Sequence, residues 1–170
     1  MLVGKKSKDI ANQDSLCFSC SIGQECCREL RFLRLTKSEY RRHFAEHQNK
    51  LIIQDCDQTC LVSSKNGQTC PNWISTTCTI YADRPVECRI FPYTLGTVYK
   101  VNNRVFISYH ERTRCPQKKA LLMSHKELEE LLIYFAHEAF GNSCEVKIKK
   151  EHLMEKLGIK LRRKLRLLKT

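Results

Sequence analysis

The segment CFSCSIGQECCR, residues 17–28, decides how this chain can fold. It opens with a C-x-x-C pair, Cys17 and Cys20, and ends with the adjacent residues Cys26 and Cys27. A C-x-x-C turn places two sulfurs on the same side of the backbone, where both can bind one metal ion. The whole chain has 11 cysteines in 170 residues, which is far more than packing requires. The sequence therefore predicts a domain built around bound metal.

A disulfide framework is the other interpretation of so many cysteines, and the first residues speak against it. Residues 1–12, MLVGKKSKDIAN, contain a basic cluster but no apolar run as long as a secretion signal needs. No segment approaches the roughly 20 apolar residues of a membrane span. We therefore expect a cytoplasmic protein without a transmembrane segment. In that compartment thiols stay reduced, and clustered cysteines serve as metal ligands or redox groups.

The charge of the chain is concentrated near its end. The formal net charge is +12, and from Lys147 to Thr170 ten Lys or Arg residues stand against two Glu, which leaves +4 for all the rest. The length and a hydrophobic fraction of 42% suit one compact domain. We predict a cysteine-cluster metal-binding domain over residues 1–146 and a basic amphipathic C-terminal tail over residues 147–170.

Apolar spacing and capping residues predict the regular elements of the first half. Residues 28–35, RELRFLRL, alternate like a half-buried strand with Leu30 and Phe32 on one side. Thr36 and Glu39 form a capping box, which predicts a helix from there to about residue 47. Residues 51–70 are rich in turn formers, and we expect a loop with one short strand at 51–53.

The second half contains the clearest elements. Residues 97–101 and 104–109 predict a β-hairpin with a two-residue turn at Asn102 and Asn103. The capping box of Ser124 and Glu127 and apolar residues at helical spacing predict a helix that stops at Gly141. We expect a last helix over 149–157. The predicted fold is a small, irregular α+β domain with a β-hairpin, two or three helices and a basic C-terminal helix, packed around a metal-centred core.

Eight cysteines are the candidate metal ligands. They are enough for two four-thiolate sites, or for one site with additional redox-active or structural cysteines. Neighbouring residues in extended backbone point to opposite sides, so the two adjacent cysteines serve different centres, or one binds metal while the other packs. The candidates are Cys17, Cys20, Cys26, Cys27, Cys70, Cys78, Cys88 and Cys115.

Two segments of the chain together resemble a known family. The first is residues 17–28, and the second is CTIYADRPVECRIFP, residues 78–92, which fits the pattern C-x-I-Y-x-x-R-P-x-x-C-R-x-F-P at every fixed position. With Cys70 before this segment and Cys115-Pro116 after it, the chain resembles the YkgJ-type cysteine-cluster family, also described as a zinc- or iron-chelating CxxCxxCC domain. The resemblance covers about residues 17–116.

The resemblance implies metal chelation, and some family members are labelled iron–sulfur oxidoreductases or protein lysine methylases. It does not settle whether this chain is an enzyme, because no residue outside the cysteines has a strong catalytic signature. The first loop is longer than the tightest form of the family pattern. Three cysteines lie outside the pattern, and we interpret them as small buried hydrophobes or free thiols: Cys56, Cys60 and Cys144.

Arginines accompany the cysteines of the second segment. Four thiolates around Zn²⁺ or around a [4Fe–4S]²⁺ cluster leave a charge of −2, which a protein must compensate. Arg84 and Arg89 stand within a few residues of Cys88, and we predict that they support the bound metal or cluster by interacting with its sulfurs. Zn²⁺ and iron both remain open, and the surplus of thiols without a nearby histidine leans toward iron.

Two functional hypotheses follow. The first is a cysteine-ligated zinc- or iron-binding protein, in which the bound iron could be a redox-active iron–sulfur cluster. The second is a zinc-stapled interaction module that binds nucleic acid or an acidic partner through residues 147–170. The same residues could instead lie on an anionic membrane surface, or cover the core with their leucines.

Overall fold

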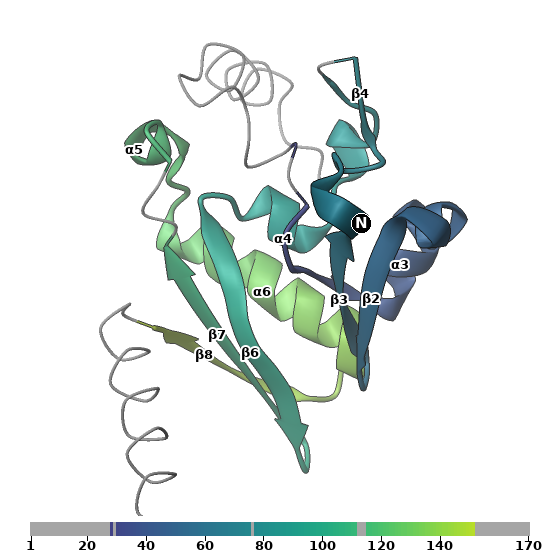
Figure 1. Cartoon of the computed structure of the whole chain (residues 1–170). Helices are drawn as coiled ribbons and strands as arrows, with labels where there is room; N and C mark the ends of the chain where they lie inside the picture. The colour runs from purple at the N-terminus through teal and green to yellow at the C-terminus, as the bar shows by residue number, and fades with distance from the viewer. Residues whose placement is uncertain (1–27, 29, 76, 112–114, 152–170) are drawn as a thin grey trace, which may run out of the picture.

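The computed structural model describes residues 28, 30–75, 77–111 and 115–151. Within them, the strands form two three-stranded sheets and one two-stranded sheet, and the two larger sheets lie on either side of one short helix (Figure 1). The predicted α+β class is confirmed. No helix among these residues is long and apolar enough to cross a membrane.

The first sheet has the strand order β1-β3-β2, with both pairs antiparallel. The three strands contribute side chains to one buried core, which includes Leu35, Phe44 and Val62. The helix α3 begins directly after β1, where the capping box of Thr36 and Glu39 is present as predicted. The elements are β1 (Leu33–Thr36), α3 (Lys37–His43), the 3₁₀ helix η1 (Ala45–Lys50), β2 (Leu51–Cys56), β3 (Thr59–Ser64) and the 3₁₀ turn η2 (Lys65–Gly67).

Two predictions for this half were wrong. The expected strand over 28–35 is only β1, because the backbone of Phe32 has a positive φ of 52° that breaks the extended chain. Phe32 is therefore 69% exposed, and Leu33 and Leu35 are buried in its place. The expected loop over 51–70 contains the hairpin β2–β3. Its two-residue connection begins at Asp57, a residue type that tolerates the left-handed φ of 57° found there.

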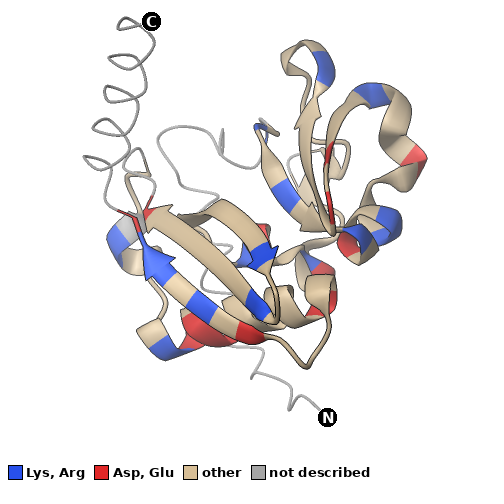
Figure 2. Cartoon of the chain, turned by 90° about the horizontal axis from the view of Figure 1, so that it is seen from below, with Lys and Arg blue, Asp and Glu red and all other residues tan. Residues whose placement is uncertain are grey.

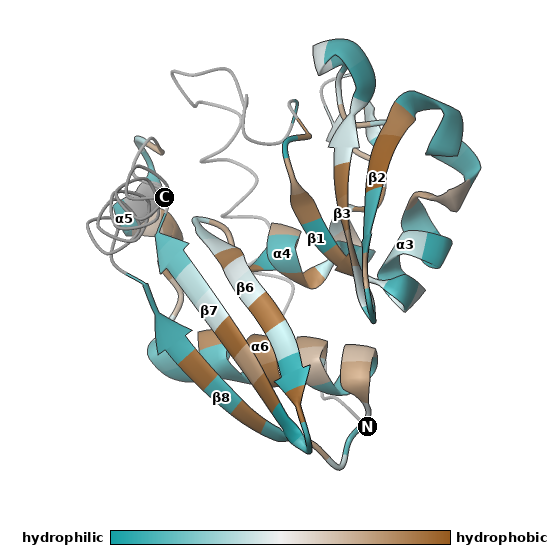
Figure 3. Ribbon diagram, turned by 60° about the horizontal axis from the view of Figure 1, so that its bottom comes forward, coloured by the Kyte–Doolittle hydropathy of each residue, from teal (hydrophilic) through white to brown (hydrophobic). Residues whose placement is uncertain are grey.

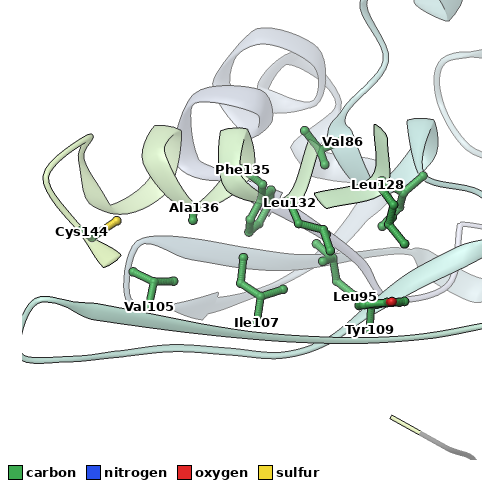
Figure 4. Close-up of a cluster of buried hydrophobic side chains, with 11 residues drawn as sticks. Val86, Leu95, Val105, Ile107, Tyr109, Leu128, Leu132, Phe135, Ala136 and Cys144 are labelled. Carbon is green, nitrogen blue, oxygen red and sulfur yellow. The ribbon is translucent and has the colours of Figure 1, made fainter. Parts of the chain in front are cut away.

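The second sheet has the order β6-β7-β8. Strands β6 and β7 form the predicted hairpin, with Asn102 at a φ of 53°, whereas β7 and β8 run parallel because the chain crosses over through α6. One face of this sheet packs against α6 (Figure 4). The elements are β4 (Trp73–Ile74), β5 (Thr77–Cys78), the 3₁₀ turn η3 (Tyr81–Asp83), α4 (Val86–Arg89), β6 (Tyr93–Val101), β7 (Arg104–Glu111), α5 (Lys118–Leu121), α6 (His125–Phe140) and β8 (Glu145–Lys150).

The helix α6 matches its prediction at both ends. Ser124 caps its first turn together with Glu127, and Gly141 follows it at a φ of 92°. Its apolar residues face the core between helix and sheet, where Leu132, Phe135 and Ala136 are fully buried. Spacing and caps are local signals, which explains why the sequence predicts this element well.

The helix predicted over 149–157 does not begin where expected. Lys149 and Lys150 belong to strand β8, in which Val146 and Ile148 are half-buried against the core on the α6 side. Residues 152–157 lie outside the described residues. The first four residues of the predicted basic tail, 147–150, are therefore part of the second sheet.

The short helix α4 connects the two halves. Val86 and Ile90 are buried in the core beneath α6, whereas Cys88 packs against the core of the first sheet. Two buried glutamates fix this helix by hydrogen bonds. Glu39 of α3 accepts from the backbone N–H of Val86 at 2.6 Å, and Glu87 accepts from the backbone N–H of Arg34 in β1 and of Leu95 in β6.

Candidate metal centre

The eight predicted ligands divide into two equal sets. Four of them, Cys17, Cys20, Cys26 and Cys27, lie outside the described residues. The other four, Cys70, Cys78, Cys88 and Cys115, are described, and no disulfide joins any two of the cysteines in the described part of the chain. The geometry of the predicted site can therefore be followed only for this second set.

Cys70 stands in a tight backbone turn. Its N–H donates to the carbonyl of Arg28 at 2.7 Å, and its carbonyl accepts from the N–H of Trp73 at 2.9 Å. Burial raises the pKa of the Cys70 thiol to about 11, and the backbone N–H groups of Asn72 and Trp73 oppose that rise. Backbone N–H groups close to a sulfur favour its thiolate form, which is the form that binds metal.

The turn after Cys70 is held firmly. The side chain of Asn72, which is buried, donates to the carbonyl of His43 at 3.0 Å. The carbonyl of Asn72 accepts from both the N–H and the hydroxyl of Thr79, at 2.9 Å and 3.1 Å. These bonds tie the turn to α3 on one side and to the chain beyond β5 on the other.

Cys78 is brought beside this turn by the two-stranded sheet β4–β5. Trp73 of β4 pairs directly with Cys78 of β5, so the turn that begins at Cys70 and the strand that carries Cys78 are adjacent. A charge on Cys78 contributes to the raised pKa of Cys70, after burial, which is the larger cause. The two sulfurs therefore lie within electrostatic range of each other.

Cys88 approaches the same place from α4. Its N–H donates to the carbonyl of Pro85 at 3.0 Å in the first turn of the helix. Burial raises the pKa of the Cys88 thiol, and charges on Glu87, Cys70 and Cys78 add to the rise. Cys70, Cys78 and Cys88 thus come from three separate segments and lie within electrostatic range of one another. Their role as metal ligands stays a prediction.

Cys115 is buried between β7 and α5. Cys88 lies shortly before β6 begins and Cys115 shortly after β7 ends, and Tyr93 at the start of β6 pairs with Glu111 at the end of β7. The antiparallel pairing therefore brings both cysteine-bearing segments to the same end of the second sheet. That Cys115 binds the same metal ion as the other three cysteines remains a prediction.

The two predicted arginines have different surroundings. The guanidinium of Arg84 lies 3.6 Å from the ring centroid of Tyr81, and its Nε donates to the Tyr81 carbonyl at 3.0 Å. Its charge also opposes the rise in the pKa of Cys88 that burial causes. Arg89 is exposed, and its charge acts against the raised pKa that burial gives Tyr134 on α6. Arg84 is thus the arginine whose charge reaches a candidate ligand.

The described cysteines do not by themselves complete a site. Among the residues that the structure describes, no group of three or more Cys, His, Asp or Glu side chains is arranged to hold a metal ion. The chemistry of Cys70, Cys78 and Cys88 nevertheless suits a soft metal, because all three are half-buried thiols that no disulfide joins.

The cysteines outside the family pattern have other surroundings. Cys60 and Cys144 are buried in the cores of the first and second sheets, which confirms them as small buried hydrophobes. Burial raises the pKa of Cys60 to about 11. Cys144 donates to the carbonyl of Gly141 at 3.1 Å, and Cys56 is half-buried at the end of β2.

Sequence reasoning missed the residues that position α4. Glu87 stands within the second cysteine segment, and its carboxylate also accepts from the hydroxyl of Thr94. Glu39 was expected only as half of a capping box, yet its second oxygen reaches α4. The sequence gives only a weak signal for Glu87, an acidic residue that directly follows Val86 and precedes Cys88, because Arg89 makes the same turn look partly polar.

Comparisons with protein-family models, with curated proteins and with solved structures find no match for this chain.

Proposed function

We propose that this protein binds zinc or iron through its clustered cysteines, with a [4Fe–4S] cluster as one form of the bound iron. The observation that supports this most directly is that Cys70, Cys78 and Cys88, from three separate segments, lie within electrostatic range of one another, with Cys78 on a strand paired to the turn that follows Cys70. The C-x-x-C pair and the adjacent cysteines of residues 17–28 would supply the remaining ligands. The protein would act in the cytoplasm, where thiolate sites persist.

Each convergent segment has a distinct part in the proposed centre. The Cys70 turn supplies a ligand whose backbone is fixed by hydrogen bonds to Arg28 and Trp73, and β5 supplies Cys78 beside it. The helix α4 supplies Cys88 and is held in place from both sheets by Glu39 and Glu87. Arg84 offsets part of the negative charge of the thiolates.

The bound group determines what the centre does. Zinc would hold the cysteine segments together and contribute to folding, whereas an iron–sulfur cluster would add one-electron redox chemistry. The residues of this chain bind the group, limit its exposure to water and compensate its charge. No reaction or substrate is assigned.

Anaerobic purification followed by metal analysis and visible absorption tests the proposal. We expect zinc or iron to copurify in stoichiometric amounts, with visible absorption only in the case of iron. Cys70→Ser, Cys78→Ser and Cys88→Ser should each lower the metal content, because each removes one proposed ligand.

Cys56→Ser is the matched control, because Cys56 is half-buried, outside the convergent set and at the end of a hairpin strand. Its metal content should equal that of the unaltered protein. Full metal content in all three ligand variants, with the protein folded by circular dichroism, would refute the proposed centre. A protein that purifies without metal and takes up neither Zn²⁺ nor Fe²⁺ under reducing conditions would do the same.

A further inference from the structure

The second sheet has one face that no described element covers. The helix α6 and the core side chains lie on the opposite face, and the strands β6, β7 and β8 lie in front of the helix when viewed from the open side (Figures 3 and 4). The registers Tyr99↔Phe106 and Phe106↔Lys147 place one residue from each strand in a row across this face. The residues on either side of this row along the strands point toward α6, as Val105 and Ile107 do.

Two aromatic rings stand together in this row. The rings of Tyr99 and Phe106 are stacked, with centroids 5.1 Å apart and planes inclined by 12°. Tyr99 is 48% exposed although its ring is large and apolar, and Val101, two residues along β6, is 50% exposed. Since β6 is an edge strand, no described strand stands beside the side of the Tyr99 ring that faces away from Phe106.

Basic side chains flank the aromatic pair. Glu145 of β8 forms ion pairs with Arg104 at 2.8 Å and with Lys147, so one carboxylate holds two cationic groups beside the rings. Lys149 follows Lys147 on the same side of β8, because alternate residues of a strand share a face. Glu151, which continues the same alternation, also lies on this side, where its carboxylate is near Gly96 and Ser108. The face therefore has three basic residues for two acidic residues, and Lys and Arg positions are visible along these strands in Figure 2.

We propose that this face binds single-stranded nucleic acid, with a base stacked on the ring of Tyr99 and the phosphates near Arg104, Lys147 and Lys149. Surfaces that bind single-stranded nucleic acid combine exposed aromatic rings with neighbouring basic side chains. The bases of a duplex are already stacked on each other and cannot extend the aromatic pair. A single strand offers unpaired bases to the aromatic rings and phosphates to the basic side chains.

Charge distinguishes this occupant from the alternatives. The chain as a whole has a net charge of +12, and residues 152–170 are strongly basic, so neither a second copy nor that segment complements the face. An apolar partner would leave the remaining positive charge of this face uncompensated, because one carboxylate, that of Glu145, pairs with both Arg104 and Lys147. The proposed surface contains none of the candidate metal ligands, so it does not depend on the metal centre.

Fluorescence anisotropy with the full-length protein tests the inference. The probes are a labelled oligothymidine and an abasic deoxyribose-phosphate strand of the same length, about 12 nucleotides, within the range that such surfaces bind. The two probes have equal charge, so their difference in affinity measures base stacking. We expect oligothymidine to bind at least about fivefold more tightly.

Tyr99→Ala should remove most of that preference, and Tyr99→Phe should keep it, because stacking needs the ring and not the hydroxyl. Tyr134→Ala is the matched control, since Tyr134 is 40% exposed but lies on α6. Raising the salt concentration should weaken the binding of both probes by the same factor and leave the ratio of their affinities unchanged. Circular dichroism verifies that each variant is folded.

Equal affinity of the unaltered protein for the two probes would overturn the inference. An unchanged preference in Tyr99→Ala would also overturn it, since the stacking would then occur elsewhere. Binding to vesicles of mixed phosphatidylcholine and phosphatidylserine that Tyr99→Ala abolishes, without any oligothymidine binding, would assign the face to a membrane and exclude the proposal. Each result can be obtained with or without bound metal, so failure here leaves the proposed metal function intact.

Discussion

Glu39 places a carboxylate where water does not reach it. The residue is only 3% exposed, and its two oxygens accept backbone N–H groups from Thr36 at 2.9 Å and from Val86 at 2.6 Å. Burial raises the pKa of Glu39 from 4.5 to about 7. The two N–H donors oppose the rise, the charge of Glu138 on α6 adds to it, and Arg42 opposes it.

This raised pKa predicts a fall in stability as pH increases. Between pH 4.5 and about 7 the folded protein keeps a proton on Glu39 that the unfolded chain has released. The contribution of Glu39 is therefore fully present below pH 4.5 and is lost as pH rises through 7, by an amount on the order of 3 kcal/mol. Urea unfolding at several pH values measures the free energy of unfolding across this range.

Glu39→Gln provides the comparison, because the amide does not titrate. The variant should be less stable in acid, since its NH₂ group must face one of two backbone donors, but its pH dependence should be flatter. Glu46→Gln, at an exposed position in η1, should retain the slope of the unaltered protein. Identical slopes for Glu39→Gln and the unaltered protein would show that Glu39 does not titrate in this range.

Single residues also show where sequence reasoning met its limits. The alternation of residues 28–35 was visible, but the positive φ of Phe32 shifts the buried side by one residue, and nothing in a phenylalanine predicts that conformation. The two apolar cores were not predicted, since the sequence analysis expected one domain packed around a metal-centred core. The second oxygen of Glu39, which joins the halves, depends on a contact 47 residues away that local patterns do not contain.

At the scale of elements, α6 is fixed by its caps. Ser124→Ala removes the side-chain oxygen that accepts from the N–H of Glu127, and should lower the free energy of unfolding by about 1 kcal/mol. Ser124→Asp keeps an acceptor at the same place and should be nearly neutral. Thermal and urea unfolding measure the difference, and equal losses in both variants would mean that the cap itself contributes nothing.

Elements with local signals were predicted, and elements defined by distant pairing were not. The hairpin β6–β7 and the helices α3 and α6 have turn or capping residues in the sequence. Strand β8 has no turn partner, because it pairs in parallel with β7 only after the chain has passed through α6. The helix predicted over 149–157 overlaps the end of this strand, although Val146 and Ile148 alternate as in a strand.

At the scale of the whole molecule, α4 makes the two cores depend on each other. Glu87 accepts hydrogen bonds from β1 and from β6, and Val86 and Cys88 of the same helix pack into different cores. We therefore expect the two halves to unfold in one transition. The fluorescence of Trp73, the single tryptophan, reports on the turn after Cys70, and circular dichroism reports on α6.

Glu87→Ala should lower the midpoint of unfolding, or separate the transition seen by tryptophan fluorescence from the one seen by circular dichroism. The substitution leaves the buried N–H groups of Arg34 and Leu95 without their acceptor, which costs on the order of 2–5 kcal/mol. Glu130→Ala, at an exposed position of α6, is the control and should leave both probes coincident. Two separate transitions in the unaltered protein, under one fixed metal condition, would contradict the coupling.

The cysteine spacing marks Cys70, Cys78 and Cys88 as candidate ligands, and the structure places them within electrostatic range of one another, while metal binding by them stays a prediction. The residues that hold these segments, Asn72 beside the Cys70 turn and Glu87 within α4, use partners far away in the sequence. Such supports become visible only when the whole molecule is folded.

The parallel pairing of β7 and β8 has a mechanical consequence. The N–H of Glu151 donates to the carbonyl of Tyr109 at 2.7 Å, which fixes the end of β8 beside the end of β7. A force that pulls on Glu151 along the strand acts across the rungs of this ladder, so the hydrogen bonds bear the load together. A force applied at Glu151 along β8 must therefore slide β8 past β7 and break their hydrogen bonds together, whereas a force perpendicular to β8 would break these hydrogen bonds one at a time.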